Sequence, residues 1–253
     1  MNWVGLNTLI NREVGRFFSV YRQTVLPGLI SSGLYIVIFG FTLEQRISEI
    51  QGVPYTLFIL PGLIMMNTLT NATANTSSSM LQMKLLQQLP DLLTAPLSGF
   101  EISLAYIIGG TVRGVVNGIL VLMLGMFLTD LTIANPVGTV AFIFLVSWAF
   151  ASMGLILGQI AESWDQLAMM QNFFLTPLSF LGGIFYSIKM LPEWAQSLSF
   201  INPIYYMING IRYTILGISD SSVNISFIMA VILTFVFTVA AIILMQSGKK
   251  IKQ

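Results

Sequence analysis

Cysteine and histidine are both absent from this 253-residue chain, and charged side chains make up only 8% of it. Without cysteine the chain has no disulfides and no thiolate to act as nucleophile or metal ligand. Without histidine the Ser-His-Asp and Cys-His arrangements and the HExxH zinc motif are excluded. A net charge of +1 offers no basic surface of the kind that binds nucleic acid. We therefore expect no catalytic residue, no metal ligand and no nucleic-acid partner.

Apolar residues are abundant instead, at 55% of the chain, and the mean hydropathy is +0.83. An ordinary soluble domain has about 25% charged residues, so this composition indicates an integral membrane protein. Only helices and closed barrels satisfy the backbone within lipid, and apolar runs of about 20 residues favour helices. The sequence predicts an all-α polytopic fold in one transmembrane domain, residues 1–253, with spans at 24–43, 55–77, 103–129, 136–159, 167–187 and 225–246.

Basic residues are concentrated at the two ends of the chain, which orients the spans. Those before the first span and after the last are Arg12, Arg16, Arg22, Lys249, Lys250 and Lys252. The predicted outer loops carry only Arg46, Lys189 and Arg212. Basic residues favour the cytoplasmic side, so both termini are expected there, with residues 247–253 as a cytoplasmic tail. The first twenty residues lack the features of a cleaved secretory signal and are expected to remain.

Residues 1–22 precede the first span and have the periodicity of an amphipathic helix. Its apolar positions are Trp3, Leu6, Ile10, Val14, Phe17 and Tyr21, and most of its polar residues lie elsewhere around the helix. The pattern predicts an interfacial helix lying on the inner membrane surface. A helix packed on another protein subunit is the alternative.

The segment between the second and third spans reads KLLQQLPDLLTAPLSGFE. Two prolines interrupt it, and Asp91 follows the first of them at a position that suits the first turn of a helix. We predict a short cytoplasmic helix that exposes Leu92 and Leu93. Exposed leucines on the cytoplasmic side would offer a contact surface to a soluble partner.

Polar side chains recur on one face of two predicted spans. In the second span Asn67, Asn71 and Asn75 are four residues apart. A buried asparagine without a partner costs about 1–3 kcal/mol, so these amides need partners or water. They either line a wet pathway or mark the place where the span enters the headgroups. The fifth span has a similar stripe, so the candidate pathway-lining residues are Asn67, Asn71, Asn172, Thr176 and Ser179.

The predicted spans also contain regularly spaced glycines and one arginine. Gly110, Gly114 and Gly118 form one smooth face, which indicates close helix packing rather than a role in transport. The predicted spans contain no Asp, Glu or His, and Arg113 is the one charged residue within them. Arg113 could bond to Asn117, approach a backbone carbonyl or reach the inner surface. No GxxxxGK[ST] motif is present, so we expect a separate ATPase to supply energy for uphill transport.

Four stretches together resemble the ABC-2-type permeases, the membrane subunits of bacterial ATP-driven exporters. They are FILPGLIMMNTLTNA, LLTAPLSGFEI, FLTPLSFLGGIFYSIKMLPEW and INPIYYMINGIRYTILG, and the likeness to the YadH-like members covers most of the chain. The resemblance implies a homodimer of six-span subunits in the bacterial inner membrane, in contact with lipid. It also implies a separate ATP-binding subunit in two copies, which would bind ATP and Mg²⁺, while this chain binds no cofactor.

The resemblance also assigns roles to particular segments. The segment from Leu86 to Ser98 would be the coupling helix that docks on the ATPase, helped by the turn from Ala161 to Gln166. The candidate coupling residues are Leu89, Pro90, Asp91, Leu92, Leu93, Pro96, Glu162 and Asp165. Pathways in this family run between the second and fifth spans, the two that carry the polar faces.

Residues 188–224 are too long for a tight turn and too interrupted for another span. Pro192 is expected to begin one short helix, and Asn202-Pro203 to turn the chain into a second that ends at Gly217. By resemblance this is an outer re-entrant hairpin, either a moving gate or a static lid. The candidate gate residues are Gly182, Gly183, Lys189, Pro192 and Pro203.

These observations favour a permease subunit of an exporter that moves an unidentified amphipathic, lipid-linked or glycan-type substrate out of the cytoplasm or inner leaflet. An ion- or proton-coupled carrier that works without an ATPase is the alternative, but it would need a titratable group within the spans. A membrane serine protease that uses Lys189 with a nearby serine is a third reading, and no flanking motif supports it.

Overall fold

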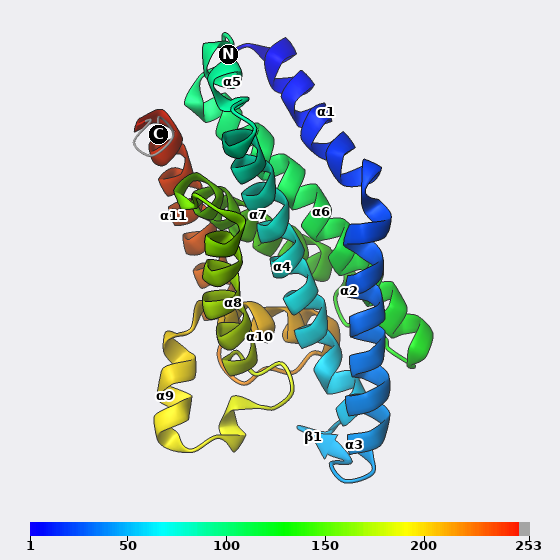
Figure 1. Cartoon of the computed structure of the whole chain (residues 1–253). Helices are drawn as coiled ribbons and strands as arrows, with labels where there is room; N and C mark the ends of the chain where they lie inside the picture. Colours follow the sequence, from blue (N-terminus) through cyan, green and yellow to red (C-terminus); the bar gives the residue numbers. More distant parts are fainter. Residues whose placement is uncertain (248–253) are drawn as a thin grey trace.

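A computed structural model describes residues 1–247, so nearly all of the predicted cytoplasmic tail, with Lys249, Lys250 and Lys252, lies outside the described residues. The chain forms a bundle of long helices with short elements at both ends (Figure 1). In order, the elements are α1 Trp3–Ser19, α2 Tyr21–Tyr35, the π-helix η1 Ile36–Phe41, α3 Thr42–Glu44, β1 Glu49–Ile50, β2 Val53–Pro54, α4 Tyr55–Leu85, α5 Leu89–Thr94, α6 Gly99–Leu128, α7 Pro136–Ile160, α8 Trp164–Leu181, the 3₁₀ turn η2 Ile188–Met190, α9 Glu193–Ile201, α10 Pro203–Leu216 and α11 Val223–Ser247. The two short strands pair antiparallel.

Five helical segments within residues 1–247 are long and apolar enough to cross a membrane. They are Tyr21–Glu44, Tyr55–Leu85, Gly99–Leu128, Pro136–Ile160 and Val223–Ser247, which match the first four and the last of the predicted spans. Helix α8, at the place of the predicted span 167–187, is not among them. It ends at Leu181, and its first half includes Asp165, Gln171 and Asn172. The all-α polytopic fold is confirmed, whereas the sixth span stays a prediction.

Helix α4 lies at the centre of the bundle, and glycines of its neighbours let those helices approach closely. A Cβ at Gly110 of α6 would lie 2.8 Å from the Cβ of Ala151 in α7, and one at Gly114 would lie 2.7 Å from Ser147 Oγ. A Cβ at Gly158 of α7 would be 2.7 Å from the Ser77 carbonyl oxygen of α4. These contacts confirm that the glycines serve helix packing, which membrane helices need because lipid provides little hydrophobic drive for association.

Capping residues fix the positions at which several helices begin or end. Ser98 and Glu101 form a reciprocal capping box at the start of α6. Asn135 and Asn202 cap α7 and α10, and in each a proline occupies the first turn, where its missing N–H costs nothing. Gly217 ends α10 in the left-handed region, with φ of 74°. The two short helices predicted after Pro192 and after Asn202 are therefore present.

Both ends of the described chain meet beside the start of α6. The backbone N–H of Asn2 donates to Glu101 Oε1, and a Cβ at Gly99 would lie 2.9 Å from Gln246 Cγ. Helix α5 lies at this end of the bundle, whereas β1 and α9 lie at the other (Figure 1). We call them the inner end and the outer end, following the predicted orientation.

Helix α1 packs on α6 of its own chain. A Cβ at Gly109 would lie 2.6 Å from the Glu13 Cβ, which shows how closely the two helices approach. The face it buries consists of Leu6, Leu9, Glu13 and Phe17, while Trp3 of the predicted apolar face is exposed. The predicted face was therefore wrong in part, because Glu13, which is outside that face, is buried in contact with Arg12 and Ser79. Its position on the membrane surface stays a prediction.

Candidate functional site

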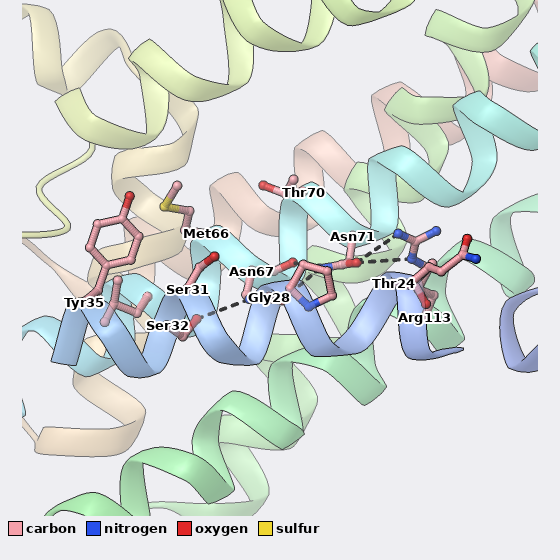
Figure 2. A pocket seen from close by; sticks show the side chains of 13 residues that line it. Thr24, Gly28, Ser31, Ser32, Tyr35, Met66, Asn67, Thr70, Asn71 and Arg113 are labelled. Atoms are coloured by element: carbon pink, nitrogen blue, oxygen red, sulfur yellow. Dashed lines mark hydrogen bonds between the residues drawn. The ribbon is translucent and has the colours of Figure 1, made fainter. Parts of the chain in front are cut away.

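A polar cavity of about 310 Å³ lies among α2, α4 and α6 (Figure 2). One wall comes from α2, between Gln23 and Tyr35, and another comes from α4, between Leu63 and Asn71. Arg113 reaches into the cavity from α6. Two of the predicted pathway-lining residues, Asn67 and Asn71, therefore face a cavity.

One chain of hydrogen bonds joins the three helices around this cavity. Arg113 Nε and Nη2 donate to Asn71 Oδ1, at 3.2 and 3.1 Å. Asn71 Nδ2 donates to Asn67 Oδ1 at 2.8 Å, and Asn67 Nδ2 donates to Ser32 Oγ at 3.3 Å. Each amide is oriented by a donor on one side and an acceptor on the other, so the chain holds Arg113 toward the cavity (Figure 2). The guanidinium points sideways to α4, and the amide of Asn117 donates to the Arg113 carbonyl instead.

The three asparagines Asn67, Asn71 and Asn75 of α4 lie in two different environments. The helix continues past all three asparagines to Leu85, so the polar run does not end it. Asn67 and Asn71 line the cavity, whereas Asn75 is buried and accepts from Arg16 of α1 through both its backbone and side-chain oxygens, at 2.7 and 3.3 Å. Whether the cavity belongs to a transport pathway stays a prediction.

The polar stripe predicted on α8 does not join this cavity. Asn172 and Thr176 are exposed, and Ser179 is buried, but none of the three lines it. The polar faces of α4 and α8 therefore do not share this cavity, and a pathway formed by both stays a prediction.

An ion cluster centred on the buried Glu13, with Arg12 and Arg16 around it, holds α1 in place. Glu13 is 1% exposed and accepts from Arg12 Nη2 at 2.8 Å and from Ser79 Oγ of α4 at 2.6 Å. Arg16 Nε lies 3.7 Å from Glu13 Oε2, and Arg12 also donates to the hydroxyl of Tyr106 in α6. Burial lowers the pKa of Arg16, and the negative charge of Glu13 opposes that shift. Sequence reasoning missed this cluster, although an acid within the apolar face of a helix was a usable signal.

Helix α5 is present as predicted, with Pro90 and Asp91 in its first turn. Leu93 is 40% exposed, which confirms its predicted exposure, while its contact with a partner stays a prediction. Leu92 is only 8% exposed and, with Leu89, belongs to the core, so its predicted exposure was wrong. A helix of one and a half turns needs an apolar face of its own to stay attached. Leu85 and Leu86, at the end of α4, are exposed beside it.

Both predicted coupling segments are attached to the inner end of the spans. Asn2 Nδ2 of the N-terminal segment donates to the Pro96 carbonyl, and a Cβ at Gly5 would lie 2.8 Å from Leu97 Cδ2. Lys84 Nζ, at the end of α4, donates to the carbonyl oxygens of Gln159 and Ala161, at 2.9 and 2.7 Å. The turn at 161–166 therefore lies next to the α4–α5 connection, and both Glu162 and Asp165 are exposed on it.

The outer end is held by a buried ion pair that the sequence did not reveal. Arg212 Nη1 lies 3.4 Å from Asp220 Oδ2, and both side chains are 1% exposed. Arg212 Nη2 also donates to the Gly183 carbonyl at 2.6 Å, in the turn after α8, where Gly183 has φ of 81°. Asp220 accepts from Ser187 Oγ and from Gln51 Nε2. Arg212 lies within α10, the second of the two short helices expected in the outer segment 188–224.

The other candidate gate residues surround this pair or lie beyond it. Gly182 and Gly183 are buried, and a Cβ at Gly62 of α4 would lie 2.8 Å from the Ile184 Cα, so the turn rests on α4. Lys189 is exposed. Pro192 precedes α9 and Pro203 begins α10. A re-entrant path of α9 and α10 through the outer leaflet stays a prediction.

A polytopic helical bundle with a polar cavity among its spans is typical of a membrane transport protein. The chain belongs to the ABC-2 type transporter family, whose sequence profile matches residues 5–216. It is 37% identical over 250 residues to the inner membrane transport permease YadH of Escherichia coli K12, a match that covers 99% of this chain and 98% of that protein.

More distant relatives are similar over a smaller part of the chain. Nodulation protein J of Rhizobium leguminosarum bv. viciae is 28% identical over 200 residues, 77% of this chain and 75% of its own length. Nodulation protein J of Sinorhizobium fredii NGR234 is 25% identical over 174 residues, 68% of this chain and 66% of that protein. The family and the apolar helices identify a multi-pass transport permease of the inner membrane, in a family whose permeases normally pair with an ATP-binding subunit.

Proposed function

We propose that this chain is the permease subunit of an ATP-driven exporter that moves an amphipathic, lipid-linked or glycan-type substrate out of the cytoplasm or inner leaflet. The observation that carries the proposal is the inner end, where exposed Leu93 of α5 is attached to the spans that surround a polar cavity. The family supports the same conclusion. ATP and Mg²⁺ would bind to a separate partner chain.

The proposed assembly is a homodimer with two ATP-binding subunits and both termini in the cytoplasm. In it α8 would be the fifth of six spans, and α9 and α10 would form the re-entrant hairpin. The exposed apolar side chains of α2 and α11 support burial of these faces in lipid or against a second copy. Leu26, Ile30 and Leu34 of α2 are examples.

The proposed coupling route starts at α5 and the turn at 161–166. A partner that pushes on Leu93 would displace α5, which is continuous with α4 and α6 through short connections. The α1 ion cluster would carry the same motion, because Glu13 and Arg16 contact α4 and Arg12 contacts α6. Movement of α4 relative to α6 would change the distance between Asn71 and Arg113, and with it the shape of the cavity.

The decisive experiment uses a candidate partner ATPase, which we expect to be encoded next to the permease gene and to carry a GxxxxGK[ST] motif. We expect ATP hydrolysis by that partner to rise several-fold when it is co-reconstituted with the permease in liposomes. An ATPase whose rate is unchanged by the permease would contradict the proposal. Transport by the permease in liposomes that lack an ATPase would instead establish the ion- or proton-coupled carrier.

A further inference from the structure

The α2–α4–α6 cavity contains a positive charge that no acid of the described chain neutralises. The ion pairs within residues 1–247 are Arg12–Glu13, Arg16–Glu13 and Arg212–Asp220, and Arg113 takes part in none of them. It is the single charged residue among those that line the cavity. Removing a cation from water is costly unless an anion compensates its charge, so this site favours binding of an anion.

The geometry of Arg113 leaves donors available to a ligand. A guanidinium has five N–H groups, and the hydrogen bonds to Asn71 Oδ1 use one on Nε and one on Nη2. The remaining three have no acceptor among the described residues. Because Asn71 is itself held by Asn67, the guanidinium is oriented before a ligand arrives. Arginine with free N–H groups suits the oxygens of a phosphate or carboxylate.

The cavity is also asymmetric along its length. Arg113, Asn71 and Thr24 lie toward one end, and Tyr35 and Met66 lie toward the other (Figure 2). Beyond the cavity, the exposed side of α2 carries Leu26 and Ile30. A ligand that fills such a site has a charged head and an apolar chain, and about 310 Å³ is near the lower limit for ligand pockets, enough for a headgroup.

We propose that this cavity binds the anionic oxygen headgroup of a membrane amphiphile, with the head on Arg113 and the chain directed toward Tyr35 and the apolar side of α2. The idea that this amphiphile is the transported substrate rests on the proposed export function. Free phosphate offers the same oxygens without the chain, so the two sources need separate arms in the test. The alternative role of Arg113, reaching the inner surface, does not fit a side chain that is held sideways by Asn71.

The test measures binding of a fluorescent short-chain phosphatidic acid to the purified permease in neutral maltoside micelles, without an ATPase. We expect Arg113→Gln to raise the Kd about ten-fold or more, because charge-assisted hydrogen bonds are lost. Arg113→Lys should weaken binding less than Arg113→Gln does, because the charge is kept while the planar fork of N–H donors is lost. Arg22→Gln, which removes a charge from α2 outside the cavity lining, should leave the Kd unchanged.

Ser31→Phe supplies a second variant that fills the cavity from α2 without altering Arg113, and it should also weaken binding about ten-fold.

Equal affinity of wild type, Arg113→Gln and Ser31→Phe would overturn the site. Binding of phosphatidylcholine as tight as that of phosphatidic acid would overturn the role of charge. Displacement by inorganic phosphate at equal concentration would overturn the amphiphile in favour of a free oxyanion. Intact lipid binding without ATPase stimulation would refute only the export function.

Discussion

Individual polar residues in the spans are informative here because there are so few of them. Asn71 is the link in the chain from Ser32 to Arg113, since it accepts from the arginine and donates to Asn67. Its replacement by an apolar residue would leave Arg113 with no acceptor and the side-chain oxygen Oδ1 of Asn67 without its donor. Removing one partner of a buried hydrogen bond typically costs about 1–3 kcal/mol.

Asn71→Leu should therefore slow substrate-dependent turnover of the reconstituted complex, while the ATPase still co-purifies, because α5 lies far from the change. Asn224→Leu, the same substitution at an exposed position, is the matched control. Turnover is measured as ATP hydrolysis per complex in liposomes, and docking as the amount of ATPase retained on the tagged permease. Wild-type turnover in Asn71→Leu would count against a role of the cavity in transport.

In the short helix α5 at the inner end, some leucines are buried against the bundle and one is exposed. In α5, Leu89 and Leu92 hold the helix on the bundle, and Leu93 points to solvent. A charge at Leu92 would therefore disturb folding, whereas a charge at Leu93 tests contact with a partner. Leu93, and not Leu92, is therefore the position at which a charged substitution tests partner contact.

Leu93→Asp should abolish co-purification of the ATPase and leave the permease in the membrane with its normal thermal unfolding in detergent. Burying a carboxylate in an apolar contact is costly, which is the physical reason for the loss. Leu198→Asp in α9 makes the same change at an exposed leucine of the outer end and should keep the ATPase bound. If Leu93→Asp retained the ATPase as well as the control does, the coupling role of α5 would be refuted.

On the scale of the whole molecule, ion pairs fasten both ends of the bundle. The inner cluster joins α1 to α4 and α6, and the Arg212–Asp220 pair joins α10 to the turn after α8 and to the loop before α11. Arg212 also lies 4.0 Å from the ring centroid of Phe58 in α4. A moving gate formed by α9 and α10 would have to break this outer pair in each cycle, whereas a static lid would not.

Asp220→Asn should destabilise the protein by about 3–5 kcal/mol, because it leaves the buried Arg212 without its counter-charge. Thermal unfolding in detergent measures the loss, and Glu193→Gln, at an exposed acid of α9, is the control and should unfold like wild type. Unfolding of Asp220→Asn at the wild-type temperature would show that the pair does not stabilise the outer end. Turnover then separates the two alternatives: a gate should open more readily in Asp220→Asn, and a lid should leave turnover unchanged.

The sequence by itself determined the all-α membrane fold, five of the spans and the two short helices after Pro192. The physical reason is that these features are local: an apolar run must match the bilayer, and prolines, asparagines and glycines act on their own turn. Periodicity also put Asn67 and Asn71 on one face, which the cavity later confirmed. It failed at Leu92 and at the face of α1, where burial depends on distant partners.

Only the tertiary structure decided which residues meet across the bundle. Glu13 meets Ser79, Asn71 meets Arg113, and Arg212 meets both Gly183 and Asp220. Nothing in the local pattern of an apolar helix specifies the neighbour that its polar side chain will face, because that depends on how several helices pack at once. Lipid makes those pairings energetically decisive, since a buried polar group has no water to take the place of a missing partner.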